Sequence, residues 1–325
     1  MPVFPQLPTR LLGATAVAAM LCASTACSNE PDDPLDGVPA FALDAPNITL
    51  DSAGENPQLL RYADTDTQPY DATVSVASGI NQQAVPVTDT SFDPQAPAGG
   101  DVDETTLPLT VTPQPAPAPG DGETDAARRV LVEAGEAKHS DLARSEDIAS
   151  AKGFLLGWRA AETGLASTVK MLAPEGSSEE GRQAVEQALL SILSATVVFP
   201  DDPVGVGGSW TVEGKLTGNA TVVRATTYTV TGIDGDRVTL DVAVHERPVQ
   251  DTLTINNQAA GELNGKSLSV ENASTTSDGE LTVDLTKPLP VAGRVAATTR
   301  LVYAGADSKF RIAQDVTSAV TYGEE

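Results

Sequence analysis

The fold class is decided by the stretch RVTLDVAVH at residues 237–245. Its large apolar side chains occupy every second position: Val238, Leu240, Val242 and Val244. Successive side chains of a β-strand point to opposite faces of a sheet, so this spacing gives one apolar face and one polar face. The alternation therefore predicts a strand that is half-buried against a core.

The same spacing recurs on both sides of that stretch. Apolar and polar residues alternate in three further runs: 280–285, 295–303 and 310–322. Weaker alternation marks three stretches of the first half: 58–63, 72–78 and 129–133. Asp234-Gly235 has the composition of a hairpin turn, and Gly157 and Gly164 favour strands over a helix between 154 and 175. We expect about six or seven antiparallel strands after Pro200, with one buried face.

One helix interrupts the strands, at residues 178–195. Ser177 and Glu180 have the spacing of a capping box. Apolar side chains then follow at helical spacing: Val185, Ala188, Leu189, Ile192 and Leu193. Together these patterns predict a mainly β (α+β) protein, in which a long twisted antiparallel sheet or half-barrel carries one amphipathic helix.

Residues 1–26 have the features of a signal peptide. A weakly basic start precedes an apolar run over 11–23, which is shorter than the roughly 20 residues of a membrane-spanning helix. The small residues 24–26 then precede Cys27, and this arrangement resembles a bacterial lipobox, whose cysteine receives a diacylglycerol. We expect Cys27 to be lipidated and to hold the protein on the extracytoplasmic face of the cell membrane. Ordinary secretion, with cleavage by a general signal peptidase, is the alternative.

The rest of the chain predicts one domain with two flexible segments. Residues 27–46 are acidic and Pro-rich, and we expect them to form a flexible tether. Residues 47–325 form a single β-rich domain, interrupted at 92–126 by an insert rich in Pro and Gly. The Pro-Ala repeat at 115–119 disfavours a helix or an inner strand, so we expect the insert to be disordered.

Charge and cysteine content exclude several classes of protein. The chain has 45 acidic and 20 basic residues, which gives a formal net charge of −25. Nucleic-acid binding is excluded, because its affinity comes from Lys and Arg at the phosphates. Cys22 lies within the expected signal peptide, and Cys27 is the first residue of the expected tether. The domain at 47–325 therefore offers no thiol for catalysis, zinc ligation or a disulfide.

No motif in the chain predicts an enzyme. Only His139 and His245 have a usual pKa near neutral pH, and His245 lies on the polar side of its expected strand. His139, Ser140 and Asp141 are adjacent in sequence, but a catalytic triad is defined by geometry. The acidic stretch 64–71 lacks the Gly and Glu spacing of an EF-hand. We expect no catalytic residue, no cofactor and no metal site, although 45 acids leave open a carboxylate pair across a cleft.

Three phrases of the sequence resemble a known family. They are LLRY at 59–62, FPDDPVGVGGSW at 199–210 and GELTVDL at 279–285. Together they resemble an uncharacterised family of bacterial, actinobacterial-type surface lipoproteins, a domain of unknown function. The resemblance implies a β-rich extracytoplasmic domain from about Asn47 to the end, and it implies no activity. From the residues themselves, the glycines of 205–208 predict a tight chain reversal, after which Trp210 opens a strand.

Two functions follow from this organisation. The first is a non-enzymatic binding protein that carries an apolar or lipid ligand under the helix, with Val185, Leu189, Ile192 and Trp210 as the ligand-binding residues. The alternative is a structural or protein-interaction component of the cell envelope. The expected partners are the membrane, through the lipid anchor, and a lipid or an envelope protein, but no nucleic acid.

Overall fold

The computed structural model describes residues 33–63, 68–216, 222–250, 252–254, 265, 267–305 and 308–323. The predicted signal peptide and Cys27 lie outside these residues, and so do Asp64 and Asp66. The first half contains β1 Phe41–Ala42, β2 Asn47–Ser52, β3 Glu55–Gln58, β4 Tyr70–Pro86, β5 Asp103–Pro115, β6 Arg128–Ala134, β7 Lys138–His139, the 3₁₀ turn Leu142–Arg144, α1 Ser145–Ser150, β8 Leu155–Ala160 and β9 Ala166–Leu172. The second half contains α2 Glu179–Ser194, β10 Val204–Val206, β11 Ser209–Leu216, β12 Val222–Asp234, β13 Arg237–Pro248, β14 Thr252–Thr254, β15 Ser267–Asp284, β16 Ala292–Ala304 and β17 Phe310–Tyr322.

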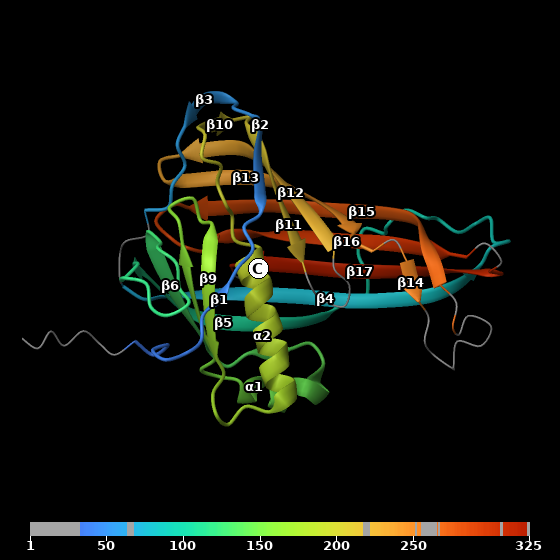
Figure 1. The fold of residues 1–325 in the computed structure, drawn as a ribbon, viewed down its shortest axis with the longest axis horizontal. Helices are drawn as coiled ribbons and strands as arrows, with labels where there is room; N and C mark the ends of the chain where they lie inside the picture. The colour runs from blue at the N-terminus through green and yellow to red at the C-terminus, as the bar shows by residue number, and fades with distance from the viewer. Residues whose placement is uncertain are drawn as a thin grey trace, which may run out of the picture.

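The protein is mainly β, and nearly all of its strands belong to one open antiparallel sheet (Figure 1). Among the described residues this sheet has fifteen strands, in the order β1-β9-β8-β6-β5-β4-β17-β16-β15-β13-β12-β11-β2, with β14 on β15 and β7 on β5. β3 and β10 form a separate pair. The predicted hairpin at Asp234-Gly235 joins β12 to β13, and Gly235 has the positive φ that such a turn requires.

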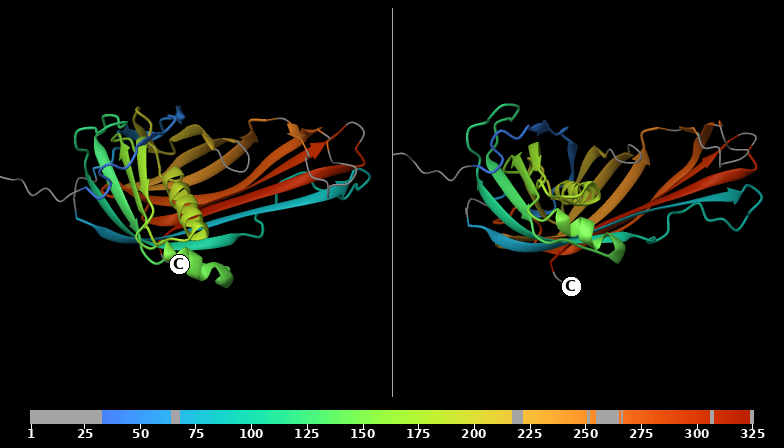
Figure 2. Two further views of the ribbon diagram at one scale, coloured as in Figure 1. Left: turned by 60° about the horizontal axis from the view of Figure 1, so that its bottom comes forward. Right: turned by 90° about the horizontal axis from the view of Figure 1, so that it is seen from below.

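The sheet curls until its two edges lie close together. β1 pairs with β9 at one edge and β2 pairs with β11 at the other, yet only residues 43–46 separate β1 from β2. Five extended residue steps span about 18 Å at most. The sheet is therefore a half-barrel at this end, as Figure 2 shows, and the chain before β2 bridges its open seam.

The helix α2 fills the concave side of the half-barrel, which we call the inner face. The buried residues of its apolar stripe are those of the sequence pattern: Val185, Ala188, Leu189, Ile192 and Leu193. The helix cap lies one residue later than the sequence predicts. The hydroxyl of Ser178, and not that of Ser177, accepts the hydrogen bond from the Gly181 amide. Ser177 instead donates to the carbonyl of Pro174 in the preceding turn.

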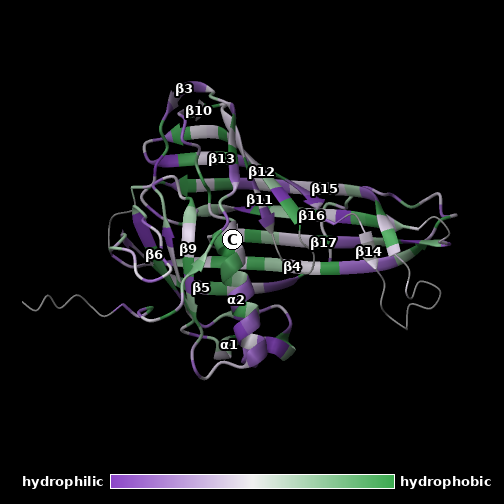
Figure 3. Cartoon of the chain, viewed as in Figure 1, coloured by the Kyte–Doolittle hydropathy of each residue, from purple (hydrophilic) through white to green (hydrophobic). Residues whose placement is uncertain are grey.

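The long strands extend well beyond α2, to the right in Figure 1. β4 is apolar beside the helix, at Val74 and Val76, and polar farther along, at 81–83 (Figure 3). A second, small core lies in this extension: Leu268, Leu301, Tyr303 and Ile312. One sheet therefore carries a half-barrel filled by α2 at one end and a second, smaller core at the other.

The expectation of a disordered insert at 92–126 is wrong for its central part. Residues Asp103–Pro115 form β5, an inner strand between β4 and β6. Pro108 is tolerated because its carbonyl accepts from the amide of Gly135, so its nitrogen faces the gap between β6 and β7 and no bond to β4 is lost. The loop before β6 is held by Glu123, which pairs with Arg159 and Lys170.

The expectation of a flexible tether at 27–46 is wrong for its described part. Residues 33–46, which we call the N-terminal arm, lie against the sheet. Leu35 is fully buried, Asp33 pairs with Arg129 at 2.5 Å, and β1 adds to the edge of β9. The Pro-rich composition concealed these anchoring residues, because they follow no periodic pattern.

The remaining strand predictions divide into confirmed and incorrect ones. Strands at 72–78 and 129–133 lie within β4 and β6, and the glycine-containing stretch after 154 forms β8 and β9. The prediction of a strand at 58–63 is wrong, because β3 ends at Gln58. After Pro200, six long strands form, in line with the six or seven expected: β11, β12, β13, β15, β16 and β17. The predicted alternation fails in the middle of β17, where Asp315 and Thr317 are buried and Phe310 is 38% exposed.

Candidate functional site

The four residues predicted to bind a ligand lie in the main core cluster. Val185, Leu189 and Trp210 have no exposed surface, and Ile192 is 2% exposed. They line neither of the two cavities described below. A ligand beneath α2 would have to displace these packed side chains, so the site has to be sought elsewhere.

Trp210 belongs to a chain of aromatic rings at the end of α2. Its ring stacks on Tyr228 at 5.2 Å between centroids and lies 5.6 Å from Phe199, which in turn lies 5.5 Å from Tyr62. The indole of Trp210 donates to the carbonyl of Val198, and the Tyr62 hydroxyl donates to that of Val197. Tyr228 is buried within this cluster, and its burial raises the pKa of the Tyr228 hydroxyl to about 12. The packed rings and these two hydrogen bonds hold the segment that follows α2, at Val197 and Val198, in place.

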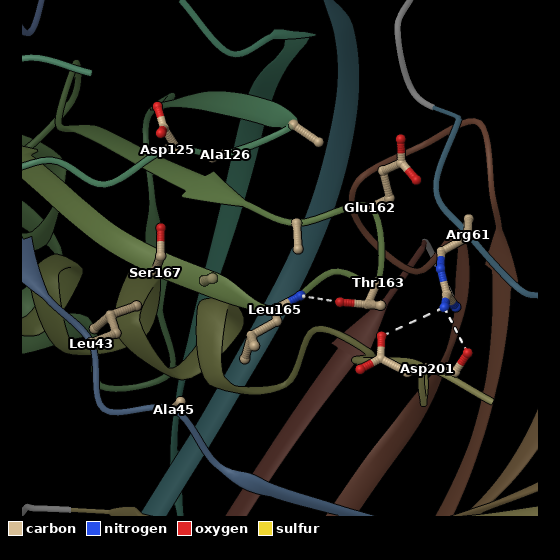
Figure 4. A pocket seen from close by; sticks show the side chains of 13 residues that line it. Leu43, Ala45, Arg61, Asp125, Ala126, Glu162, Thr163, Leu165, Ser167 and Asp201 are labelled. Atoms are coloured by element: carbon tan, nitrogen blue, oxygen red, sulfur yellow. Dashed lines mark hydrogen bonds and ion pairs between the residues drawn. The ribbon is translucent and has the colours of Figure 1, made fainter. Parts of the chain in front are cut away.

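A groove of about 700 Å³ opens beside the N-terminal arm (Figure 4). Five parts of the chain line it: Leu43 and Ala45 of the arm, Arg61, residues 125–127, residues 161–163 with 165–167, and Asp201. Leucine and alanine side chains make up much of this lining, and charged groups stand among them. We take this groove as the candidate functional site.

The turn between β8 and β9 forms one wall of the groove. It is tight because Gly164, with a φ of +92°, closes a hydrogen bond to the carbonyl of Ala161. Neighbouring segments hold it from both sides, since Tyr62 donates to the Glu162 carbonyl and Phe199 donates to the Thr163 carbonyl. The opposite wall is the arm, where the amide of Leu43 donates to the carbonyl of Ser167 at 2.9 Å.

Among the described residues that line the groove, Arg61 is the only cation. Its guanidinium donates to the carbonyls of Leu60, Pro200 and Asp201 at 2.8–3.0 Å, and it lies 3.6 Å from the Asp201 carboxylate. It is therefore committed to fixing the loop after α2. Asp125 and Glu162 are exposed carboxylates at the rim, which makes the mouth of the groove acidic.

The histidine-centred motif has structural roles and no triad geometry. Nδ1 of His139 accepts a 3.0 Å bond from the amide of Asp141, and the carboxylate of Asp141 caps the 3₁₀ turn at Ala143. The Ser140 hydroxyl accepts from the amide of Glu104. Each of the three side chains thus bonds a different backbone amide, and these bonds do not link the three side chains to one another. His245 is exposed, and Asp71 is exposed beside β5.

A second, smaller cavity of about 350 Å³ lies on the outer face of the extension. Arg300 and Asp315 form a bidentate pair at its base, with bonds of 2.6 and 2.7 Å. The loop before β5 crosses above them, because Asn272 and Thr276 donate to the carbonyls of Pro94 and Ala96. The charged side chains of this cavity are bonded to each other, and its volume is half that of the groove, so the groove remains the stronger candidate.

Sequence reasoning missed the groove because no local pattern marks it. Its lining comes from segments up to 158 residues apart, from Leu43 to Asp201, and it includes the arm that composition assigned to a tether. Among the described residues, no three His, Cys, Asp or Glu side chains are grouped so that they could hold a metal ion. No described helix has the length and apolar character needed to cross a membrane. No family model and no curated protein matches the chain.

Proposed function

We propose that this chain is a non-enzymatic binding protein, lipid-anchored through Cys27 on the extracytoplasmic face of the membrane, that takes a small apolar or lipid-derived ligand. The observation that carries this proposal is the groove of about 700 Å³ beside the arm. Its volume lies within the roughly 300–1,000 Å³ of small-molecule sites. Its alanine and leucine walls favour an apolar body for the ligand.

The position of the arm supports a ligand drawn from the membrane. Only five residues lie between Cys27 and Asp33, the first described residue, and six extended steps span about 22 Å at most. Asp33 is held on β6 by Arg129. An acyl anchor at Cys27 would therefore keep the β6–β8–β9 side of the half-barrel, and the groove with it, close to the bilayer.

The chemistry of the lining favours binding over reaction. The hydroxyl of Ser167 donates to the Arg159 carbonyl, and Arg61 is fixed by three carbonyls. The carboxylates at the rim are exposed, and the lining contributed by the described residues contains neither a histidine nor a cysteine. The groove thus offers shape and apolar contact and no activated nucleophile.

Native mass spectrometry of the protein purified from its own membrane tests this proposal. We expect a mass that includes acylation at Cys27, and a retained ligand. Ala161→Trp places an indole in the groove and should abolish the retained mass, whereas Ala292→Trp, at an exposed position on β16, should keep it. A mature protein without acylation, or a retained ligand unaffected by Ala161→Trp, would contradict the proposal.

The alternative function, interaction with an envelope protein, has one observation in its favour. On the inner face beyond α2, the side chain of Ile80 on β4 is 47% exposed. It lies opposite Val316 on β17 in the same strand register as the core pair Val76–Val320. A photo-crosslinker at Ile80 that captures one envelope protein in intact cells, while a crosslinker at Arg294 on the outer face does not, would favour this alternative.

A further inference from the structure

The N-terminal arm is attached unequally to the two edges that it bridges. At the β11 edge, β2 makes five residue pairs. At the β9 edge, β1 makes only two, Phe41–Val169 and Ala42–Thr168, and the side chain of Phe41 remains 57% exposed. Segments with few backbone bonds and little buried apolar surface open at lower free energy than the rest of a fold. The backbone pairing of the arm is therefore weaker at β9 than at β11.

Three further contacts hold the arm on this side. Asp33 pairs with Arg129. Leu35 lies over Gly157, where a Cβ atom would come within 2.4 Å of the leucine methyl group, so the glycine leaves room for this side chain. The amide of Leu43 donates to the carbonyl of Ser167. These contacts are separate and sequential along the arm, so it can detach stepwise from Asp33 towards Leu43.

The same stretch of the arm forms a wall of the groove. Leu43 and Ala45 line it, midway between the two edges of the sheet. When the β1 side is released, the pairs of β2 with β11 remain and set the hinge before Asn47. Detachment of residues 33–43 would then remove one wall of the groove and open the seam of the half-barrel.

We propose that the N-terminal arm is a gate, hinged at β2, whose release from β8 and β9 admits and discharges the ligand of the groove. This inference rests on the proposed function, because a gate has meaning only if the groove binds a ligand. The arm also leads directly to Cys27. Ligand exchange is therefore coupled to the geometry of the membrane anchor.

A disulfide between positions 42 and 168 tests the gate. Leu43 and Ser167 form a hydrogen-bonded pair, so Ala42 and Thr168 are the adjacent non-bonded pair, whose Cα atoms stand about 4.5 Å apart. That separation suits a disulfide. Among the described residues, the hydroxyl of Thr168 has no hydrogen-bond partner, so Thr168→Cys sacrifices no bond. The described domain holds no other cysteine.

The experiment uses the full lipid-anchored protein in detergent micelles and the neutral dye N-phenyl-1-naphthylamine as the probe. In the oxidised Ala42→Cys/Thr168→Cys variant, we expect dye release to slow at least tenfold relative to the single variants, and reduction should restore it. Equal release rates in the oxidised and reduced forms would overturn the gate and leave the groove as a binding site. Absence of saturable dye binding in both forms would overturn the gate and the proposed function together.

Hydrogen exchange provides a readout that does not depend on the disulfide. In the unmodified protein, the bonded amides of Phe41 and Leu43 should exchange at least tenfold faster than the bonded amides of β2, and bound dye should selectively slow the exchange of Phe41 and Leu43. Equal protection of the two segments would show that the arm and β2 open as one unit, which would overturn the gate even if the disulfide fails to form.

Discussion

The indole nitrogen of Trp210 donates a 2.8 Å hydrogen bond to the carbonyl of Val198. This bond joins the start of β11 to the segment that follows α2. It lies inside the core, where Trp210 has no exposed surface. The helix is thus fixed at its C-terminal side by a side chain from the sheet that it covers. Trp210 and the buried stripe of α2 belong to the same core cluster.

Replacing this tryptophan should destabilise the protein without unfolding it. Trp210→Phe leaves the Val198 carbonyl unsatisfied and reduces stacking on Tyr228, so we expect the free energy of unfolding to fall by about 1–3 kcal/mol. Chemical denaturation monitored by circular dichroism gives this value. Leu142→Ala is the control, because Leu142 is 83% exposed and its replacement should change stability by less than about 0.5 kcal/mol.

A glycine in α2 should resist replacement by a better helix former. A Cβ atom on Gly181 would lie 1.9 Å from the carbonyl oxygen of Asp147 in α1, so the two helices would have to separate. Helix propensity alone favours Gly181→Ala by about 1 kcal/mol. We expect the clash to dominate and the variant to lose at least about 1 kcal/mol in a denaturant titration. A stabilised variant would show that the helices are not in contact there, and Glu180→Ala at the neighbouring exposed position serves as the control.

The position of the helix cap can be measured directly. Ser178→Ala removes the acceptor for the Gly181 amide and should cost about 1 kcal/mol. Ser177→Ala removes only a bond to the Pro174 carbonyl and should cost less. If thermal or chemical unfolding gave the reverse order, the cap would lie where the capping-box pattern of the sequence predicted it.

Acid should release the loop that precedes β6. Burial on its own would raise the pKa of Glu123, but the Gly120 amide, Lys170 and Arg159 outweigh it and hold the pKa below its usual 4.5. Because the folded-state pKa is lowered, the stabilisation by Glu123 is complete above pH 4.5 and is lost as the pH falls through the lowered value. Glu123→Gln should therefore flatten the decline of unfolding free energy between pH 5 and pH 3 (roughly the range of carboxylate titration).

The control for this pH dependence is Glu136→Gln, which removes the same charge from an exposed position. It should follow the wild-type profile. Equal flattening by both variants would mean that the paired carboxylate makes no special contribution and that general charge repulsion sets the acid stability.

The regular parts of the fold were accessible from the sequence because they are periodic. The alternation at Val238, Leu240, Val242 and Val244 and the helical stripe of α2 report burial on one face, and the structure buries those side chains. The hairpin at Asp234-Gly235 is a local signal of the same kind. Each of these features depends only on neighbours along the chain.

The errors share a different physical origin. Pro108 suggested an edge or loop, but its effect depends on which side of β5 its nitrogen faces, and only the pairing partners decide that. Leu35 and Asp33 looked like tether residues, because their partners Gly157 and Arg129 lie about a hundred residues away. The groove is a purely tertiary feature for the same reason. Its walls are formed by separate segments that no motif connects.

The central claim is that the groove beside the arm binds an apolar molecule. Fluorescence titration of the full-length protein with N-phenyl-1-naphthylamine tests it, with Ala161→Trp to fill the groove and Ala292→Trp as the matched control. We predict saturable binding to the wild type and to Ala292→Trp, and at least a tenfold weaker affinity in Ala161→Trp. Undiminished binding by Ala161→Trp, or no saturable binding by the wild type, would contradict the account.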